Sequence, residues 1–132
     1  MATTADGKLD FSGIAGTWVG QVEGDLFGNP VGTWRIELEI EAAADRSSVV
    51  GTTTTTTAGG ARCVNPMAAI DASPPVYEFR ERPGESVGDD ERPCEGGTRV
   101  RLTAQPGADE VHYKALIGNG NLEGVLGRID GP

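Results

Sequence analysis

The sequence predicts an all-β protein that forms an eight-stranded antiparallel up-and-down barrel. Residues 33–41 alternate strictly: Trp34, Ile36, Leu38 and Ile40 share one face, and charged side chains occupy most of the other. That period of two is typical of a strand with one buried and one exposed face. Weaker copies recur along the chain without any helical period. Twenty glycines and eight prolines separate them, as expected of short strands joined by tight turns.

The predicted strands follow one another between turn signals. The first covers residues 17–23 and places Trp18, Gly20 and Val22 on one face. A loop over residues 24–32, containing Gly-Asn-Pro, leads to the alternating strand at residues 33–42. The remaining six strands are expected at residues 49–58, 62–70, 76–82, 98–104, 110–117 and 122–129.

Six consecutive threonines, residues 52–57, dominate the strand expected at residues 49–58. Threonine is β-branched and therefore favours a strand. One alternate set must face inward, either Thr52, Thr54 and Thr56 or the set that begins at Thr53. Three hydroxyls in a core are costly unless they bond to each other, to water or to a ligand. Either a cavity with one polar wall or a shallow, partly open barrel would explain them.

A chain of 132 residues is enough for one domain with its own core. We expect a flexible N-terminus at residues 1–12 and a single barrel domain at residues 13–132. Eight strands enclose an interior that either fills with side chains or holds one small ligand. Closure also removes the exposed edges of an open sheet.

The net charge of −9 argues against nucleic acid and anionic membranes as partners, because both require a basic surface. No apolar run is long enough to cross a bilayer, and the N-terminus lacks the apolar segment of a signal peptide. We expect a cytoplasmic protein if the chain is complete, and an extracytoplasmic one if it is an excised domain. The expected assembly is a monomer or a homodimer.

The chain has two cysteines, Cys63 and Cys94, and one histidine, His112. This set is too small for a structural zinc site, so we expect no metal. The sequence also lacks nucleotide-binding motifs, and we expect no cofactor. Two alternatives remain for the cysteines. They form one disulfide, closing a loop of about 30 residues and contributing roughly 3–4 kcal/mol, or they are two buried thiols.

The inward face of the predicted strands supplies the candidate ligand-binding residues. They are Trp18, Trp34, Ile36, Leu38, Tyr77, Phe79, Val100, Leu102 and Tyr113. Tryptophans in such positions more often plug an end of the barrel than line a cavity, which is the alternative for Trp18 and Trp34. Tyrosine hydroxyls need partners when buried, so Tyr77 and Tyr113 could orient a ligand.

Glu81 falls on the same face as Tyr77 and Phe79. A carboxylate directed at an apolar interior must be paired, protonated or near the mouth. A raised pKa would make Glu81 a general acid or base, with Tyr77 and Tyr113 as further catalytic candidates. The simpler alternative is that Glu81 ends its strand beside Pro83 and reaches water.

Two resemblances extend this interpretation. The segment Gly16-Thr17-Trp18 is similar to the start of lipocalin and avidin-type barrels, which makes the expected barrel calycin-like. Nearly the whole chain resembles a small bacterial β-domain often found C-terminal to serine/threonine kinase domains. The matching segments, in order, are Gly16 to Gly20, Val50-Gly51-Thr52 before Cys63, Arg80-Glu81-Arg82, and Cys94 followed by Gly97-Thr98-Arg99-Val100. This resemblance implies a ligand-sensing or accessory barrel with a Cys63–Cys94 bridge.

Three functions therefore remain open. The first is a module that binds a small apolar or amphipathic molecule inside the barrel. The second is a cofactor-free cyclase or isomerase of natural-product biosynthesis, in which Glu81 or a tyrosine moves a proton. The third is a filled barrel with a structural or protein-interaction role.

Overall fold

The computed structural model describes residues 3–26, 29–30, 32–87, 94, 96–104, 109–117 and 120–129. These residues form strands, one short 3₁₀-helix (η1) and no α-helix. The elements are β1 Leu9–Asp10, η1 Ser12–Ile14, β2 Gly16–Leu26, β3 Asn29–Pro30, β4 Trp34–Ile40, β5 Ala43–Ala44, β6 Val49–Thr56, β7 Arg62–Ser73, β8 Val76–Glu81, β9 Glu85–Val87, β10 Arg99–Thr103, β11 Glu110–Ile117 and β12 Gly120–Arg128.

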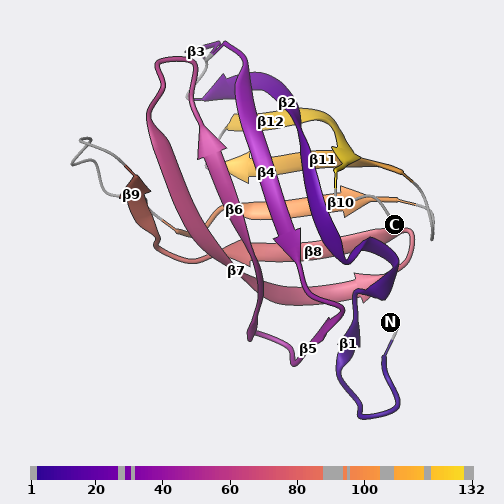
Figure 1. The fold of residues 1–132 in the computed structure, drawn as a ribbon. Helices are drawn as coiled ribbons and strands as arrows, with labels where there is room; N and C mark the ends of the chain where they lie inside the picture. The colour runs from indigo at the N-terminus through magenta and orange to yellow at the C-terminus, as the bar shows by residue number, and fades with distance from the viewer. Residues whose placement is uncertain are drawn as a thin grey trace.

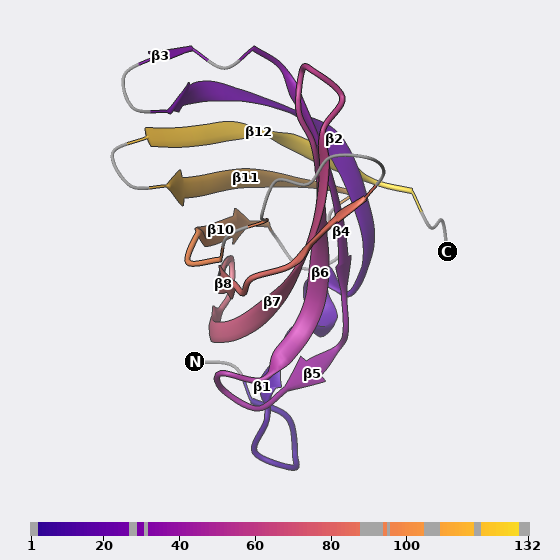
Figure 2. The same cartoon turned by 90° about the vertical axis from the view of Figure 1, so that its left-hand side faces the viewer.

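Eight of these strands close into an antiparallel barrel in the order β2-β4-β6-β7-β8-β10-β11-β12, and β12 pairs back with β2. The predicted eight-stranded up-and-down barrel is confirmed. Figure 1 shows two layers: β2, β4, β6 and β7 run steeply down the front, and β8, β10, β11 and β12 cross behind them. Figure 2 shows the same layers from the side, with β11 and β12 in one and β4 and β6 in the other.

Two long strands, β2 and β7, connect the layers. The strand β2 pairs with β4 through Gly16 to Val22 and with β12 through Trp18 to Asp25. The strand β7 pairs with β6 and then with β8, and irregularities occur in both registers. Such bulges allow a strand to bend from one layer into the next. This double pairing explains why both strands extend beyond their predicted ends and why β2 enters the predicted loop at residues 24–32.

The alternation that predicted β4 corresponds to its burial. Ile36 and Leu38 are fully buried and Ile40 nearly so, while Arg35 and Glu39 are exposed. The same alternation in β8, β10, β11 and β12 directs apolar side chains inward. The core is one contiguous cluster that includes residues from both layers.

The N-terminal segment packs against the barrel earlier than the expected boundary at residue 13. The strand β1 pairs with β5, and the Phe11 N–H donates to the carbonyl of Ala42 at 2.8 Å. The Phe11 ring is fully buried, with its centroid 5.2 Å from that of Phe79 and 6.0 Å from that of Tyr77. The packed domain therefore begins near Leu9.

Phe11, Ile14 and Trp18 together fill one end of the barrel, which we call the plugged end. All three side chains are fully buried. The Trp18 indole Nε1–H donates to the carbonyl of Ile14 at 2.8 Å, which fixes the 3₁₀-helix against the first barrel strand.

Candidate functional site

Glu81 lies on the inner face of the barrel, at the last position of β8. It pairs with the fully buried Met67 on β7, and its neighbours Arg80 and Arg82 are exposed. We call the end of the barrel where β8 and β11 finish and β10 and β12 start the Glu81 end. It lies opposite the plugged end. Trp18 pairs with Arg128, the last residue of β12, and the antiparallel registers of the back layer place the end of β8 beside the start of β12 at the other end.

The Glu81 carboxylate is buried, with only 7% of the residue exposed. It forms no hydrogen bond or ion pair with any residue that the structure describes. Its backbone groups are satisfied: the Glu81 N–H donates to Thr98 O, and Glu81 O accepts from the Gly97 N–H. Burial raises the pKa of the carboxyl from 4.5 to about 7, because a low-dielectric interior disfavours the charged form.

The register of β6 decides which threonines face inward. Thr53 pairs with Leu38 on one side and Asn65 on the other, and Thr55 pairs with Ile36 and Cys63. Thr53 is fully buried, and its Oγ1 has no hydrogen-bond partner among the described residues. The set that begins at Thr53 is therefore the inward one.

Thr53, Asn65 and Glu81 are the buried polar or charged residues of the described chain. They lie on the inner faces of three consecutive strands, β6, β7 and β8. Thr53 is directly opposite Asn65, and Asn65 is two residues before Met67, the partner of Glu81. Diagonal neighbours of this kind are roughly 7–8 Å apart at Cα. We call these three residues the polar strip; it crosses an otherwise apolar interior.

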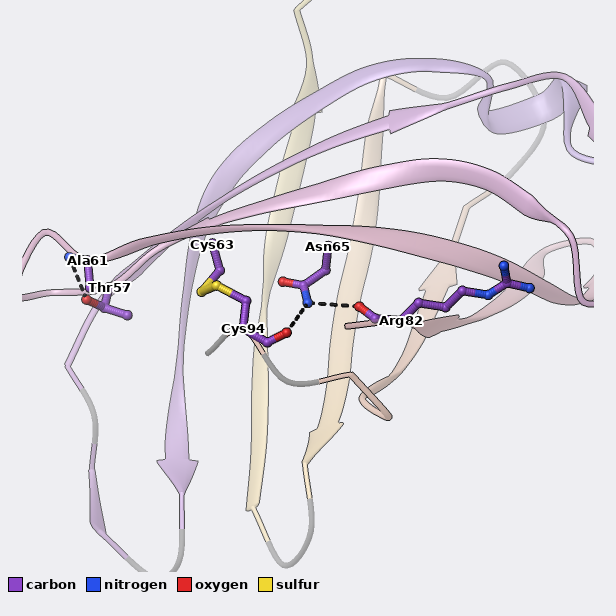
Figure 3. The surroundings of a disulfide bond; sticks show 6 residues. All are labelled: Thr57, Ala61, Cys63, Asn65, Arg82 and Cys94. Carbon is purple, nitrogen blue, oxygen red and sulfur yellow. Dashed lines mark hydrogen bonds between the residues drawn. A yellow bond between two sulfur atoms is a disulfide. The ribbon is translucent and has the colours of Figure 1, made fainter. Parts of the chain in front are cut away.

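Asn65 has a structural role within the polar strip (Figure 3). Its Nδ2 donates to the carbonyl of Arg82 at 3.0 Å and to the carbonyl of Cys94 at 3.3 Å. The Gly84 N–H also donates to Cys94 O, at 2.8 Å. Asn65 therefore connects Arg82, the residue after β8, to Cys94 beside the Glu81 end.

The Cys63–Cys94 disulfide strengthens the same connection. Cys63 and Asn65 extend from the same side of β7 (Figure 3), because they are two residues apart in a strand. Of the two alternatives left by the sequence, the structure has the disulfide. It joins β7 to a buried Cys94 at the rim of the Glu81 end.

The two candidate tyrosines lie on opposite sides of Leu102, which pairs with Tyr77 on β8 and with Tyr113 on β11. Burial, and after it the charge of Glu81, raises the pKa of the Tyr113 hydroxyl well above 10. Burial, and after it the charge of Asp10, raises the pKa of Tyr77. The register places Tyr113 level with Tyr77, and Tyr77 is in ring contact with Phe11 at the plugged end.

The predicted lining residues lie at the plugged end, at the edge of the core and along the interior walls. Trp18, Tyr77 and Phe79 are buried at the plugged end, where Trp18 and Phe79 leave no exposed surface. Trp34 is only half-buried and packs against the edge of the core. The remaining predicted residues are buried along the interior walls: Ile36, Leu38, Val100, Leu102 and Tyr113.

The hollows on the outer surface or rim of the described residues include the following three. The first, about 660 Å³, lies at the junction of β2 and β12 and includes Glu23, Asp25 and Glu123. Another, about 320 Å³, lies over Glu39 and Thr52. The third, about 390 Å³, lies beside β8 and includes Arg80, Glu81 and Arg82.

The described residues contain no cluster of three or more His, Cys, Asp or Glu side chains that could hold a metal ion. Nor do they include a helix with the length and hydropathy needed to span a lipid bilayer. No family model, curated protein or solved structure matches the chain.

Sequence reasoning singled out Glu81 and expected one alternate set of threonines to face inward without deciding which set, and it missed Asn65. A usable signal existed, because Asn65 is two residues after Cys63 and must share its face in a strand. An inward cysteine therefore implies an inward amide at position 65. The partners of that amide are backbone carbonyls distant in sequence, which no local pattern predicts.

Proposed function

We propose that this protein is a small-molecule-binding β-barrel, a sensor or accessory module that holds a largely apolar or amphipathic molecule at the Glu81 end. The polar strip carries the proposal. A barrel with a purely structural role has no use for a buried carboxylate without a partner, because burying an unpaired polar group costs free energy. A ligand that bonds to Glu81 and Thr53 removes that cost.

The position of the plug supports this choice of end. Phe11 and Trp18 occupy the opposite end with well-packed aromatic rings, so the apolar part of a ligand must be short. Ala115 and Leu122 are buried, paired neighbours on the inner wall, and Tyr113 is on the same strand as Ala115. Ala115 is a small, fully buried side chain on this wall, and we therefore place the apolar part of the ligand beside it.

The sensor or accessory role follows from the resemblance to the bacterial β-domain found beside kinase domains. That resemblance implied a Cys63–Cys94 bridge, and the disulfide is present. A disulfide at the rim would hold the entrance in one shape, which suits a preformed binding site.

An alternative proposal is a cofactor-free cyclase or isomerase. A buried Glu81 with a pKa of about 7 could accept and return a proton near neutral pH, and Tyr113 could orient the substrate. This alternative predicts that Glu81→Gln abolishes turnover while substrate still binds. If candidate substrates bind without turnover, the enzyme alternative is wrong and the sensor or accessory module is the proposal that stands.

A neutral fluorescent probe, N-phenyl-1-naphthylamine, tests the binding proposal. We expect a saturable increase in its emission with one site per chain. Ala115→Phe should abolish that signal by filling the interior. Leu116→Phe, the next residue and partly exposed on the outer face, should retain it. The proposal fails if the wild-type protein shows no saturable binding, or if Ala115→Phe, shown to be folded by circular dichroism, binds as the wild type does.

A further inference from the structure

We infer that the ligand of this barrel carries a protonated amine, which the acceptors of the polar strip bind inside the Glu81 end. The inference rests on the proposed function and adds the chemical class of the ligand. It depends on a count of the hydrogen-bond acceptors and donors that the inner wall presents.

The acceptors of the strip are unused by the protein. The Thr53 Oγ1 is buried without a hydrogen-bond partner among the described residues. The Glu81 carboxylate, on a residue that is 7% exposed, makes no hydrogen bond or ion pair to a described side chain. A hydroxyl accepts as well as donates, and an ionised carboxylate only accepts. Together they present more acceptor than donor capacity on β6 and β8, the two strands that flank β7.

The hydrogen-bond donors near the polar strip already have acceptors or point away from the interior. The Asn65 Nδ2 donates to the carbonyls of Arg82 and Cys94. No described lysine or arginine is buried. The cations closest to Glu81 in sequence, Arg80 and Arg82, are exposed, and the Arg82 guanidinium bonds to the carbonyl of Ser47 on the outside. None of the described cations therefore faces this wall, and we assign the positive charge to the ligand.

The surface charge favours the same class of molecule. The chain carries a net charge of −9, which attracts cations and slows the approach of anions. At the Glu81 end, the hollow of about 660 Å³ on the outer wall is lined by Glu23, Asp25 and Glu123. Glu23 and Glu123 are directly paired across β2 and β12. Glu123 also contacts Lys114 at 3.4 Å, so Glu23 and Asp25 contribute most of the negative charge of this hollow.

A matched series of naphthalene probes isolates the headgroup. The three compounds, 1-naphthylmethylamine, 1-naphthalenemethanol and 1-naphthoate, share one apolar body and differ in charge. Each is used at pH 8 to displace N-phenyl-1-naphthylamine from the full chain. We expect the amine to displace the probe at a concentration about tenfold lower than the carboxylate, with the alcohol between them, since a charge-assisted hydrogen bond exceeds a neutral one.

The quantity compared among variants is the ratio of the amine and carboxylate affinities. Glu81→Gln should bring that ratio close to one, and Thr53→Val should lower it several-fold. Glu39→Gln is the control, because it changes the net charge equally on the exposed face of β4; it should keep the wild-type ratio. Circular dichroism establishes that each variant is folded.

The possible outcomes separate the two proposals. If the wild type binds the neutral probe but shows no preference for the amine, the headgroup inference is wrong and the binding proposal stands. If Glu39→Gln reduces the ratio as much as Glu81→Gln does, the preference arises from net charge and the inference is again wrong. If the wild type does not bind the neutral probe, the proposed function itself fails.

Discussion

The guanidinium of Arg128, at the end of the last barrel strand, lies over the indole of Trp18, with its Cζ 4.2 Å from the ring centroid. Its Nη1 also donates to the carbonyl of Ala15 at 2.6 Å. Because Trp18 belongs to the first barrel strand, these two contacts join the ends of the closed sheet. They also seal the plugged end from outside.

Arg128→Ala should therefore destabilise the protein by about 2 kcal/mol, through the loss of a cation–π contact and a charge-assisted hydrogen bond. Arg128→Lys should cost less, because it keeps the charge but loses the planar fork. Urea unfolding followed by tryptophan fluorescence measures both. Equal stability of Arg128→Ala and the wild type would contradict the proposed role of this contact.

Phe11→Ala should cost about 3–5 kcal/mol, as expected for an aromatic side chain removed from a packed core. The exposed neighbour offers a matched control, since Ser12→Ala should change the free energy of unfolding by less than about 0.5 kcal/mol. If the N-terminus were a flexible tail, both substitutions would be neutral. Thermal unfolding at one pH distinguishes the two cases.

Gly124→Ala should destabilise the barrel by about 1–3 kcal/mol. A Cβ at this position would overlap the carbonyl oxygen of Gln21 across the seam where β12 closes onto β2. Gly127, on the same strand, has open space around it, so Gly127→Ala should be nearly neutral. Comparable losses in the two variants would show that close approach at the seam is not the cause.

The double variant Cys63→Ala, Cys94→Ala should be less stable than the oxidised wild type by roughly 3–4 kcal/mol, because the bridge spans 31 positions and restricts the unfolded chain. A reductant should lower the stability of the wild type and leave the double variant unchanged. The denatured, unreduced protein should show no reactive thiols on titration. Two titratable thiols would contradict the bridge.

Glu81 should make stability depend on pH in a defined direction. Its pKa is about 7 in the folded protein and near 4.5 when unfolded, so the folded state binds the extra proton between these values. The stabilisation is complete below pH 4.5 and is lost as the pH rises to 7, by about 3 kcal/mol.

Glu81→Gln removes this titration. The free energy of unfolding of both proteins is measured in urea at several pH values from 4.5 to 8. As the pH rises across this range, the variant should gain about 3 kcal/mol of stability relative to the wild type. The titration of the other carboxyl groups contributes equally to both proteins and cancels in the comparison. A constant difference across the range would mean that Glu81 titrates normally.

Much of the fold could be predicted from local pattern. The alternation from Trp34 to Ile40 requires a strand with one buried face, and the same reasoning placed Glu81 inward beside Phe79. Period-two patterning is a local property, because successive side chains must point to opposite faces wherever a strand forms. The pattern can therefore be recognised without knowing which strands pair with it.

Other features depended on pairing between distant segments. Six identical threonines contain no phase information, so only the register with Leu38 and Asn65 shows that Thr53 is inward. The burial of Phe11 required β1 to pair with β5, more than thirty positions later.

By itself, then, the sequence determined the strand pattern, the eight-stranded barrel and an inward carboxylate at position 81. Only the tertiary structure decided which end is plugged, which threonine accompanies Glu81, and that Asn65 binds two distant carbonyls. Patterning acts between neighbours in the chain, whereas these three features arise from contacts between residues that only the closed sheet brings together.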